Sequence, residues 1–186
     1  GFKFTNTTIT LQSGPTLNSG DTFIVDAPAV YRYGLNKTAI RMHYIEGNVS
    51  KNAINVVDIG CNQGVIAFNL ALHGFQVKGY EKQTQFLNYG KELVNHDRIS
   101  NISFFEESIG FDNLTVLDDS DVNVLLSVHH QMVKHLGLEE GNRLLKEIFK
   151  RSRRQFFFQP ATIYDKYGCQ MPFAENDYMA IERYFL

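Results

Sequence analysis

The sequence predicts a doubly wound α/β fold with a mostly parallel sheet, and three observations lead to this prediction. Five short segments with strand character alternate with helical segments between residues 55 and 160. The hydrophobic run Val56–Ile59 leads into Gly60 and Gly64, as at a tight turn from a strand to a helix. The run Asp121–Ser127 is almost continuously apolar, which is typical of a strand covered on both faces. Such alternation builds a sheet with helices on its two faces.

Length and composition place the chain among ordinary globular domains. It has 186 residues, of which 44% are hydrophobic and 20% charged, enough for one domain with a real core. A net charge of −2 gives no support for a nucleic-acid-binding protein, and we interpret the basic cluster Lys150–Arg154 as charge facing a helix dipole. No apolar run approaches the roughly 20 residues that span a bilayer. Two cysteines are too few for a disulfide framework, so we expect free thiols and a cytoplasmic protein.

We expect two parts in the chain. Residues 1–35 form an N-terminal extension or lid, in which the alternation over 2–26 predicts short strands or an ordered loop. Residues 36–186 form the core domain, which begins with an amphipathic helix over 36–46. The chain begins with Gly1 and lacks a signal-peptide pattern, which is compatible with an excised piece of a longer chain.

Periodicity predicts the remaining elements of the core. After the first strand, further strands are expected over residues 75–81, 101–106, 121–127 and 155–159. Helices are expected over residues 65–73, 84–95 and 138–152, with another beginning at 178–186. Residues 110–120 leave room for about one helical turn.

The stretch Asp58–Gly64 carries a functional signal. Its glycines stand in the pattern Asp58-x-Gly60-x-x-x-Gly64 at the N-terminus of a predicted helix, where the backbone can approach a ligand. A dinucleotide-binding turn needs a glycine at the position of Asn62, which argues against a pyrophosphate cradle. Glu81 ends the next strand, about 20 residues on, where a carboxylate can accept both ribose hydroxyl protons.

These landmarks, Asp58-x-Gly60-x-x-x-Gly64 followed by Glu81, resemble motif I and the next strand of the class I S-adenosylmethionine (SAM) dependent methyltransferases. The resemblance covers about residues 36–186. It implies a Rossmann-like methyltransferase core, SAM as the cofactor and methyl transfer as the activity. That family normally closes its sheet with a C-terminal antiparallel hairpin. We expect the hairpin to be missing here, because five strands are visible and the sequence stops at the last helix.

The resemblance also implies roles for individual residues. The turn backbone would face the methionine half of SAM, Asp58 would hold the turn or reach the amino group through water, and Glu81 would bind the ribose. The third motif would place Glu107, Ser108 and the Ile109 amide near the adenine, with the serine at the position of the usual aspartate. The cofactor-binding residues expected on this basis are Asp58, Gly60, Cys61, Asn62, Gly64, Glu81, Lys82, Glu107, Ser108, Ile109, Ser127, Arg41 and Tyr31, and we expect no metal ligands.

Two histidines follow the fourth predicted strand. His129 and His130 come directly after Ser127-Val128, at the carboxyl end of a buried strand, where ligands bind in open α/β sheets. A histidine near its pKa can take a proton from an attacking hydroxyl, so both are candidate catalytic residues. Adjacent side chains point in different directions, and we expect His130 to lie closer to the acceptor. Either histidine could instead be a packed core residue.

The sequence predicts the acceptor only as a class. The segment Leu126–His130, followed by Gly137 and a Leu-rich helix, is similar to small-molecule and glycan-pathway methyltransferases. We therefore expect a small-molecule or glycan-type acceptor, methylated on oxygen. The segment Tyr31-Arg32-Tyr33 with Arg41 resembles the methylphosphate-capping RNA methyltransferases, so an RNA-end methyltransferase is one alternative. In either case Arg41 could pair with the donor's carboxylate. A SAM-binding module without turnover is a second alternative, motivated by the missing hairpin and the altered third motif.

Overall fold

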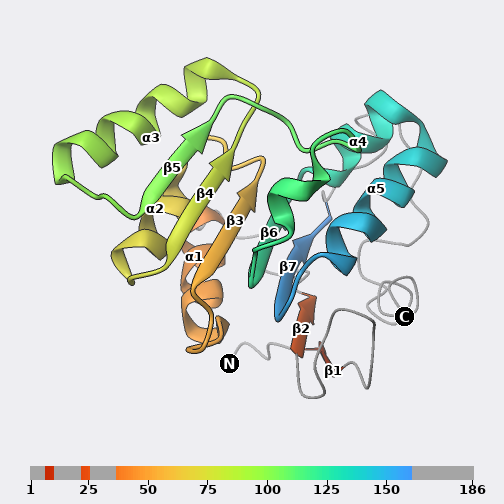
Figure 1. Ribbon diagram of the computed structural model, residues 1–186, viewed down its shortest axis with the longest axis horizontal. Helices are drawn as coiled ribbons and strands as arrows, with labels where there is room; N and C mark the ends of the chain where they lie inside the picture. The colour runs from red at the N-terminus through yellow and green to blue at the C-terminus, as the bar shows by residue number, and fades with distance from the viewer. Residues whose placement is uncertain (1–6, 11–21, 26–36, 161–186) are drawn as a thin grey trace.

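The computed structural model describes residues 7–10, 22–25 and 37–160, which form a seven-stranded sheet with helices on both faces (Figure 1). The strand order is β1-β2-β7-β6-β3-β4-β5. The parallel core consists of β3 (Asn55–Ile59), β4 (Gln76–Tyr80), β5 (Ile102–Phe105), β6 (Val122–Leu126) and β7 (Gln155–Gln159). This five-stranded core confirms the predicted doubly wound α/β fold.

Two short strands from the N-terminal part extend the sheet beyond β7. β1 (Thr7–Thr10) pairs antiparallel with β2 (Thr22–Val25), and β2 pairs parallel with β7. Short strands are therefore present in the stretch where the sequence predicts them. The helix expected over residues 178–186 lies outside the described residues, and so does the region where a closing hairpin would follow.

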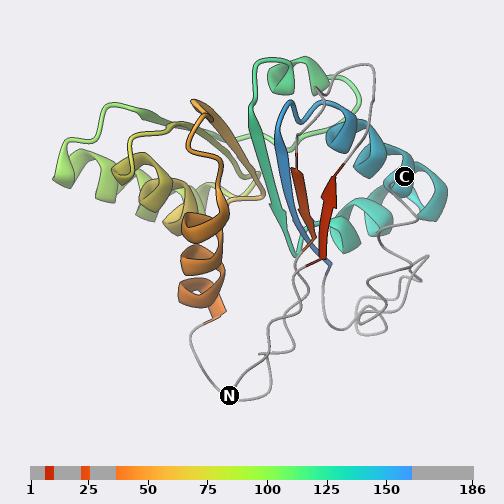
Figure 2. The same cartoon turned by 90° about the horizontal axis from the view of Figure 1, so that it is seen from below.

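The helices divide between the two faces of the sheet (Figure 2). One face carries α1 (Lys37–Asn48), α2 (Val65–Leu72) and α3 (Thr84–Asp97), and the other carries α4 (His129–Leu136) and α5 (Leu138–Lys150). A 3-10 turn, η2 (Leu114–Leu117), supplies the single turn expected before β6. Periodicity did not predict α4. Among the residues that the structure describes, no helix is both long and apolar enough to cross a membrane.

The three consecutive phenylalanines of β7 join the two hydrophobic layers. Successive side chains of a strand point to opposite faces of a sheet. Phe156 and Phe158 accordingly pack in the cluster that includes Leu145 and Ile148 of α5. Phe157 packs in the other cluster, with Leu70 of α2. A central strand with both faces buried explains the continuous apolar sequence.

The ring of Phe104 on β5 occupies space that three glycines leave open. A Cβ on Gly64 would overlap the Phe104 Cζ, and a Cβ on Gly79 would lie 2.7 Å from its Cδ1. A Cβ on Gly90 of α3 would lie 3.0 Å from the same ring. Gly64 also has a φ of 72°, in the left-handed region that favours glycine. This one ring therefore determines how closely the glycine turn, β4 and α3 approach β5.

The Phe104 contact can be measured with two matched glycine substitutions. Gly74 also has a positive φ, 93°, but a Cβ added there would meet no atom within 4 Å beyond its chain neighbours. We expect Gly74→Ala to cost about 1–2 kcal/mol of unfolding free energy, from the backbone alone. Gly64→Ala should cost roughly 1–3 kcal/mol more, because the added methyl overpacks the ring. Urea unfolding of both variants measures the difference, and Phe104→Leu should recover part of the Gly64→Ala loss. Equal losses in the two variants would show that the ring does not constrain the turn.

Candidate functional site

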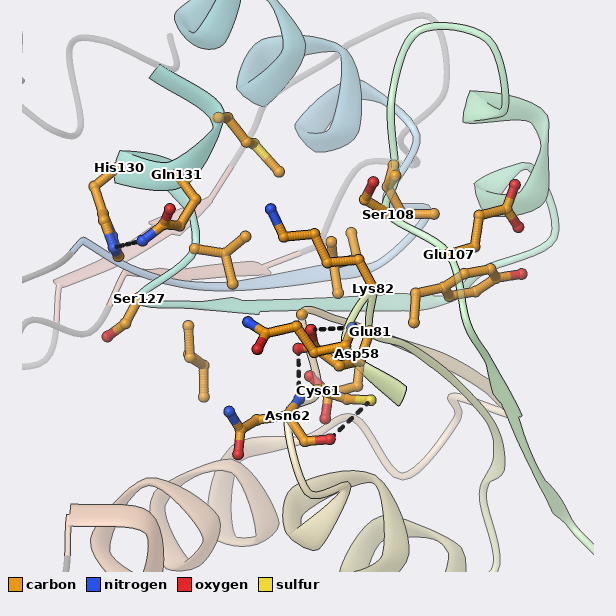
Figure 3. A pocket seen from close by; sticks show the side chains of 18 of the residues that line it. Asp58, Cys61, Asn62, Glu81, Lys82, Glu107, Ser108, Ser127, His130 and Gln131 are labelled. Carbon is orange, nitrogen blue, oxygen red and sulfur yellow. Dashed lines mark hydrogen bonds between the residues drawn. The ribbon is translucent and has the colours of Figure 1, made fainter. Parts of the chain in front are cut away.

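A cavity of about 790 Å³ opens at the carboxyl ends of β3, β4 and β6 (Figure 3). Such an edge is where open α/β sheets bind their ligands. The expected site residues that line it are Arg41, Asp58, Gly60, Cys61, Asn62, Glu81, Lys82, Glu107, Ser108, Ile109, Ser127 and His130. Gly64 and His129 do not line the cavity, and Tyr31 lies outside the described residues. The structure thus brings together residues that are far apart in the sequence.

The turn between β3 and α2 forms the floor of this cavity. Gly60 and Asn62 have φ values of 70° and 53°, so the chain reverses through left-handed conformations. The N–H groups of Gly60 and Cys61 both donate to the Tyr80 carbonyl, at 2.8 and 3.0 Å, which fixes the turn against β4. A Cβ on Gly60 would overlap the Val128 Cγ2, so only glycine fits beside the β6 exit. Burial raises the pKa of the Cys61 thiol, which therefore remains protonated.

The Glu81 carboxylate lies at the end of β4 and binds the glycine turn. It is 9% exposed, and its Oε2 accepts the Asn62 N–H at 3.2 Å. Its Oε1 accepts the Gln83 N–H at 3.0 Å. A carboxylate has about four lone-pair sites, so two such bonds orient the group and leave it able to accept two ligand hydroxyls. The ribose-binding role that the resemblance implies for Glu81 stays a prediction.

Asp58 is a buried carboxylate with one oxygen that the protein leaves unsatisfied. It is 3% exposed, and it accepts a hydrogen bond from the Ala67 N–H in the first turn of α2. Its Oδ2 has no hydrogen-bond partner. Burial raises the pKa of Asp58 from 3.8 to about 7, with a further contribution from the charge of Glu81. A cationic or hydrogen-bond-donating ligand group beside Oδ2 would remove this penalty.

The loop after β5 forms another wall of the cavity, next to apolar side chains. Glu107, Ser108 and Ile109 line it together with Leu144 of α5, and Ile109 and Leu144 are 5% and 1% exposed. Asn113, which sequence reasoning missed, donates to the Glu107 Oε1 at 2.9 Å and to the Ser108 carbonyl at 3.0 Å. An Asn at a loop position is a common turn residue, so its pattern alone carried no functional signal.

The end of β6 brings Arg41 to the cavity. Ser127 has a φ of 57°, and its N–H donates to the Gln159 carbonyl at 2.8 Å. The Arg41 Nη2 donates to the Ser127 Oγ at 2.9 Å. Residues 86 positions apart are thereby joined, and the guanidinium from α1 is held beside the turn that leads to α4. A guanidinium in this position is suited to a ligand carboxylate.

The two histidines have different environments. His129 is fully buried, contacts the Phe158 ring edge-on at 5.9 Å, and hydrogen-bonds with the Asn142 side chain and the Gly141 backbone. Burial lowers the pKa of His129 to about 4. His130 lines the cavity, and its Nε2 lies 2.7 Å from the Gln131 Nε2 (Figure 3). Burial also lowers the pKa of His130, with a smaller effect from Lys134, so the imidazole is neutral at pH 7.

Helix α4 adds cavity residues that the sequence did not predict. Gln131, Met132, His135 and Leu136 recur at the spacing of one helix face and all line the cavity. The Lys82 Nζ lies 3.1 Å from the His135 Nε2, so this hydrogen bond links the end of β4 to α4. Lys82 therefore contacts the opposite wall of the cavity and does not stand alone in solvent.

The basic cluster after α5 is paired with carboxylates. Arg151 pairs with Asp118, and Arg153 with Asp119 at 3.0 Å. Arg154 lies 3.4 Å from Asp121. These aspartates balance the positive charge of the three arginines, and a phosphate-binding surface would need that charge unbalanced.

Comparisons with known proteins support the fold. No protein-family model matches the sequence, and no curated protein matches it. A co-crystal structure of WbdD with the kinase inhibitor LY294002 is 25% identical over 60% of this chain, with a TM-score of 0.51. The crystal structure of monomeric WbdD is 22% identical over 78% of this chain, also with a TM-score of 0.51. Another WbdD structure describes that protein as a bifunctional kinase-methyltransferase; it is 24% identical over 59% of this chain, with a TM-score of 0.49.

The matched part is a small share of those proteins, since this chain covers 26% and 32% of the first two WbdD chains. The strand order, the glycine turn and these likenesses together show the fold of the class I SAM-dependent methyltransferases. The chain therefore has a Rossmann-like methyltransferase core.

The buried Asp58 predicts a pH dependence of stability. The pKa of Asp58 is higher in the folded than in the unfolded protein, so its protonation contributes to the free energy of unfolding. This contribution is fully present below about pH 4 and is lost as the pH rises through about 7. Each pKa unit is worth about 1.4 kcal/mol, so the loss amounts to a few kcal/mol at most. Urea unfolding at pH 5 and pH 8 should show wild type losing more stability than Asp58→Asn across this window. The same pH dependence in both proteins would contradict the assignment of the shift to Asp58.

Proposed function

We propose that the protein is a SAM-dependent methyltransferase that moves a methyl group to an oxygen of a small-molecule or glycan-type acceptor. The observation that carries this proposal is the Glu81 carboxylate, which binds the Asn62 N–H of the glycine turn at the edge where the fold binds ligands. A carboxylate in that position serves a ribose. Asn62 in place of a glycine argues against a dinucleotide pyrophosphate.

The residues of the cavity fit the chemical groups of SAM. Glu81 would accept the ribose hydroxyls, and the unsatisfied Oδ2 of Asp58 would face a cationic amino group. Arg41 would pair with the carboxylate of the same amino-acid end. The apolar surfaces of Ile109 and Leu144 would contact the base. When bound, SAM supplies a sulfonium methyl group.

The contribution of the protein would be orientation together with proton transfer at one imidazole. Most of the rate enhancement would come from proximity, because the protein would hold the acceptor oxygen in line with the methyl group. For a hydroxyl acceptor, the His130 Nε2 would accept the proton once the acceptor hydroxyl takes the place of the Gln131 amide, because the lowered pKa leaves the imidazole uncharged at pH 7. A phosphate or carboxylate acceptor would need no base.

The structure also bears on the two alternative functions, an RNA-end methyltransferase and a SAM-binding module without turnover. The paired arginines after α5 give an RNA end no free basic surface there, which favours a small acceptor. A SAM-binding module without turnover would have no use for a neutral histidine in the wall of the donor cavity. The presence of His130 there supports a catalytic role.

Donor binding tests the proposal first. SAM and its demethylated product, S-adenosylhomocysteine, should both raise the melting temperature, because each binds only the folded state, whereas NAD should not. Glu81→Ala should weaken SAM binding by about 1.5–3 kcal/mol, the usual loss for a hydrogen bond to a charged group. Glu92→Ala, which removes an exposed carboxylate on α3, is the matched control. Stabilisation by NAD but not by SAM would refute the donor assignment.

The two histidines provide a matched pair for the acceptor end. With an acceptor identified by mass spectrometry of co-purifying molecules, His130→Ala should lower turnover by about 10²–10⁴-fold with SAM affinity intact, as for loss of a general base. His129→Ala should instead lower the unfolding free energy by about 2 kcal/mol or more, because it removes a packed side chain. If both variants turn over normally, the acceptor must be a group that needs no base.

A further inference from the structure

The Asn113 side chain ties together the loop that follows β5. Its Nδ2 donates to the Glu107 Oε1 at 2.9 Å and to the Ser108 carbonyl at 3.0 Å. Its Oδ1 accepts the Gly110 N–H at 2.8 Å. Both the donor and the acceptor ends of one amide are therefore bonded to a segment of four residues. A loop has no regular backbone ladder, so side-chain bonds of this kind set its conformation.

This loop forms the end of the cavity that is suited to a flat base. Ile109 is buried within it and lies beside Leu144 and Tyr80 in the cavity wall. The Tyr80 ring in turn stacks on the Phe105 ring, with centroids 4.9 Å apart. Asn113 itself does not line the cavity, and any effect it has on a ligand must act through the loop.

The bond to Asn113 also directs the Glu107 carboxylate. Figure 3 shows the Glu107 side chain extending away from the group around Asp58 and Glu81. Its Oε1 is bonded to an amide that lies outside the cavity wall. A carboxylate released from this bond would be free to turn back toward the apolar surface where the base would lie. Placing a charge against such a surface costs desolvation energy.

We propose that Asn113 is a positioning residue for the nucleoside end of the donor, which fixes the 107–110 loop and holds the Glu107 carboxylate aside from the base. This inference rests on the proposed function, because it takes the ligand to be an adenine nucleoside. It assigns to Asn113 the ordering of the loop at which the sequence has a serine in place of the family's usual aspartate.

The test measures S-adenosylhomocysteine affinity by calorimetry and adenosine affinity by competition. Asn113→Ala should weaken both by the same factor, about tenfold, because the whole loss lies in the nucleoside part. In turnover, KM for SAM should rise while kcat at saturation stays unchanged. Thr115→Ala, on the exposed face of η2, is the matched control and should bind like wild type.

Exchanging the amide and the carboxylate between positions 113 and 107 distinguishes a role of Asn113 in positioning the loop from a general effect on folding. Asn113→Asp places a second carboxylate against Glu107 and should bind nucleoside as poorly as Asn113→Ala. Adding Glu107→Gln lets the new amide donate to the new carboxylate, but the Ser108 carbonyl then has no donor at position 113, so the double variant should regain part of the affinity. If Asn113→Ala does not fold, the comparison of Asn113→Asp with the double variant still tests whether Asn113 positions the loop.

Two results would overturn the inference. Unchanged adenosine affinity in variants with a lowered melting temperature would make Asn113 a scaffold residue only, and the proposed function would stand. A wild-type protein that binds neither adenosine nor S-adenosylhomocysteine would reject the donor site itself, and the inference with it.

Discussion

The packing of the Phe104 ring into three glycine positions is the constraint on which the site depends. Gly64 and Gly79 approach the ring so closely that a methyl group at either position would overlap with it. Protein interiors are close-packed, so such a contact leaves the surrounding elements little freedom. Because the ring lies between the glycine turn and β4, it fixes the floor of the cavity relative to the Glu81 carboxylate.

Two carboxylates share that floor and behave differently because their bonds differ. Glu81 accepts two backbone N–H groups and is held in a defined orientation. Asp58 is more deeply buried, and this burial, with a smaller contribution from the charge of Glu81, raises its pKa to about 7. Its Oδ2 has no hydrogen-bond partner. Arg41 and Lys82 contribute positive charge to other parts of the wall. A ligand with both an ammonium and a carboxylate, together with a ribose, would match this distribution of charge.

Much of the fold could be predicted from the sequence because it rests on local pattern. The buried strands are continuous apolar runs, and the turn has glycines where φ is positive, as at Gly60 and Gly64. Helix α4 was missed because it begins at His129 and its N-cap residue, Val128, has no side chain that could cap the helix and signal its start. The pairing of β2 with β7 could not be predicted either, since two strands more than a hundred residues apart leave no local signal in the sequence.

The site was predictable to the extent that it lies at strand ends. Parallel strands deliver their carboxyl ends to one edge, which is why Asp58, Glu81 and Ser127 converge. Which of two adjacent histidines faces the cavity depends on helix phase, and the phase of α4 was unknown without the helix itself. Asn113 escaped notice because its role depends on contacts within an irregular loop.

Amide hydrogen exchange with and without S-adenosylhomocysteine tests the central claim most directly, because it reports where a ligand stabilises the backbone. A donor bound as proposed should slow exchange in three separate segments: the turn 60–65, the segment 81–83 that follows β4, and the loop 107–110. The strands of the core should change little. Protection confined to another face of the protein, or none at saturating ligand, would contradict the account.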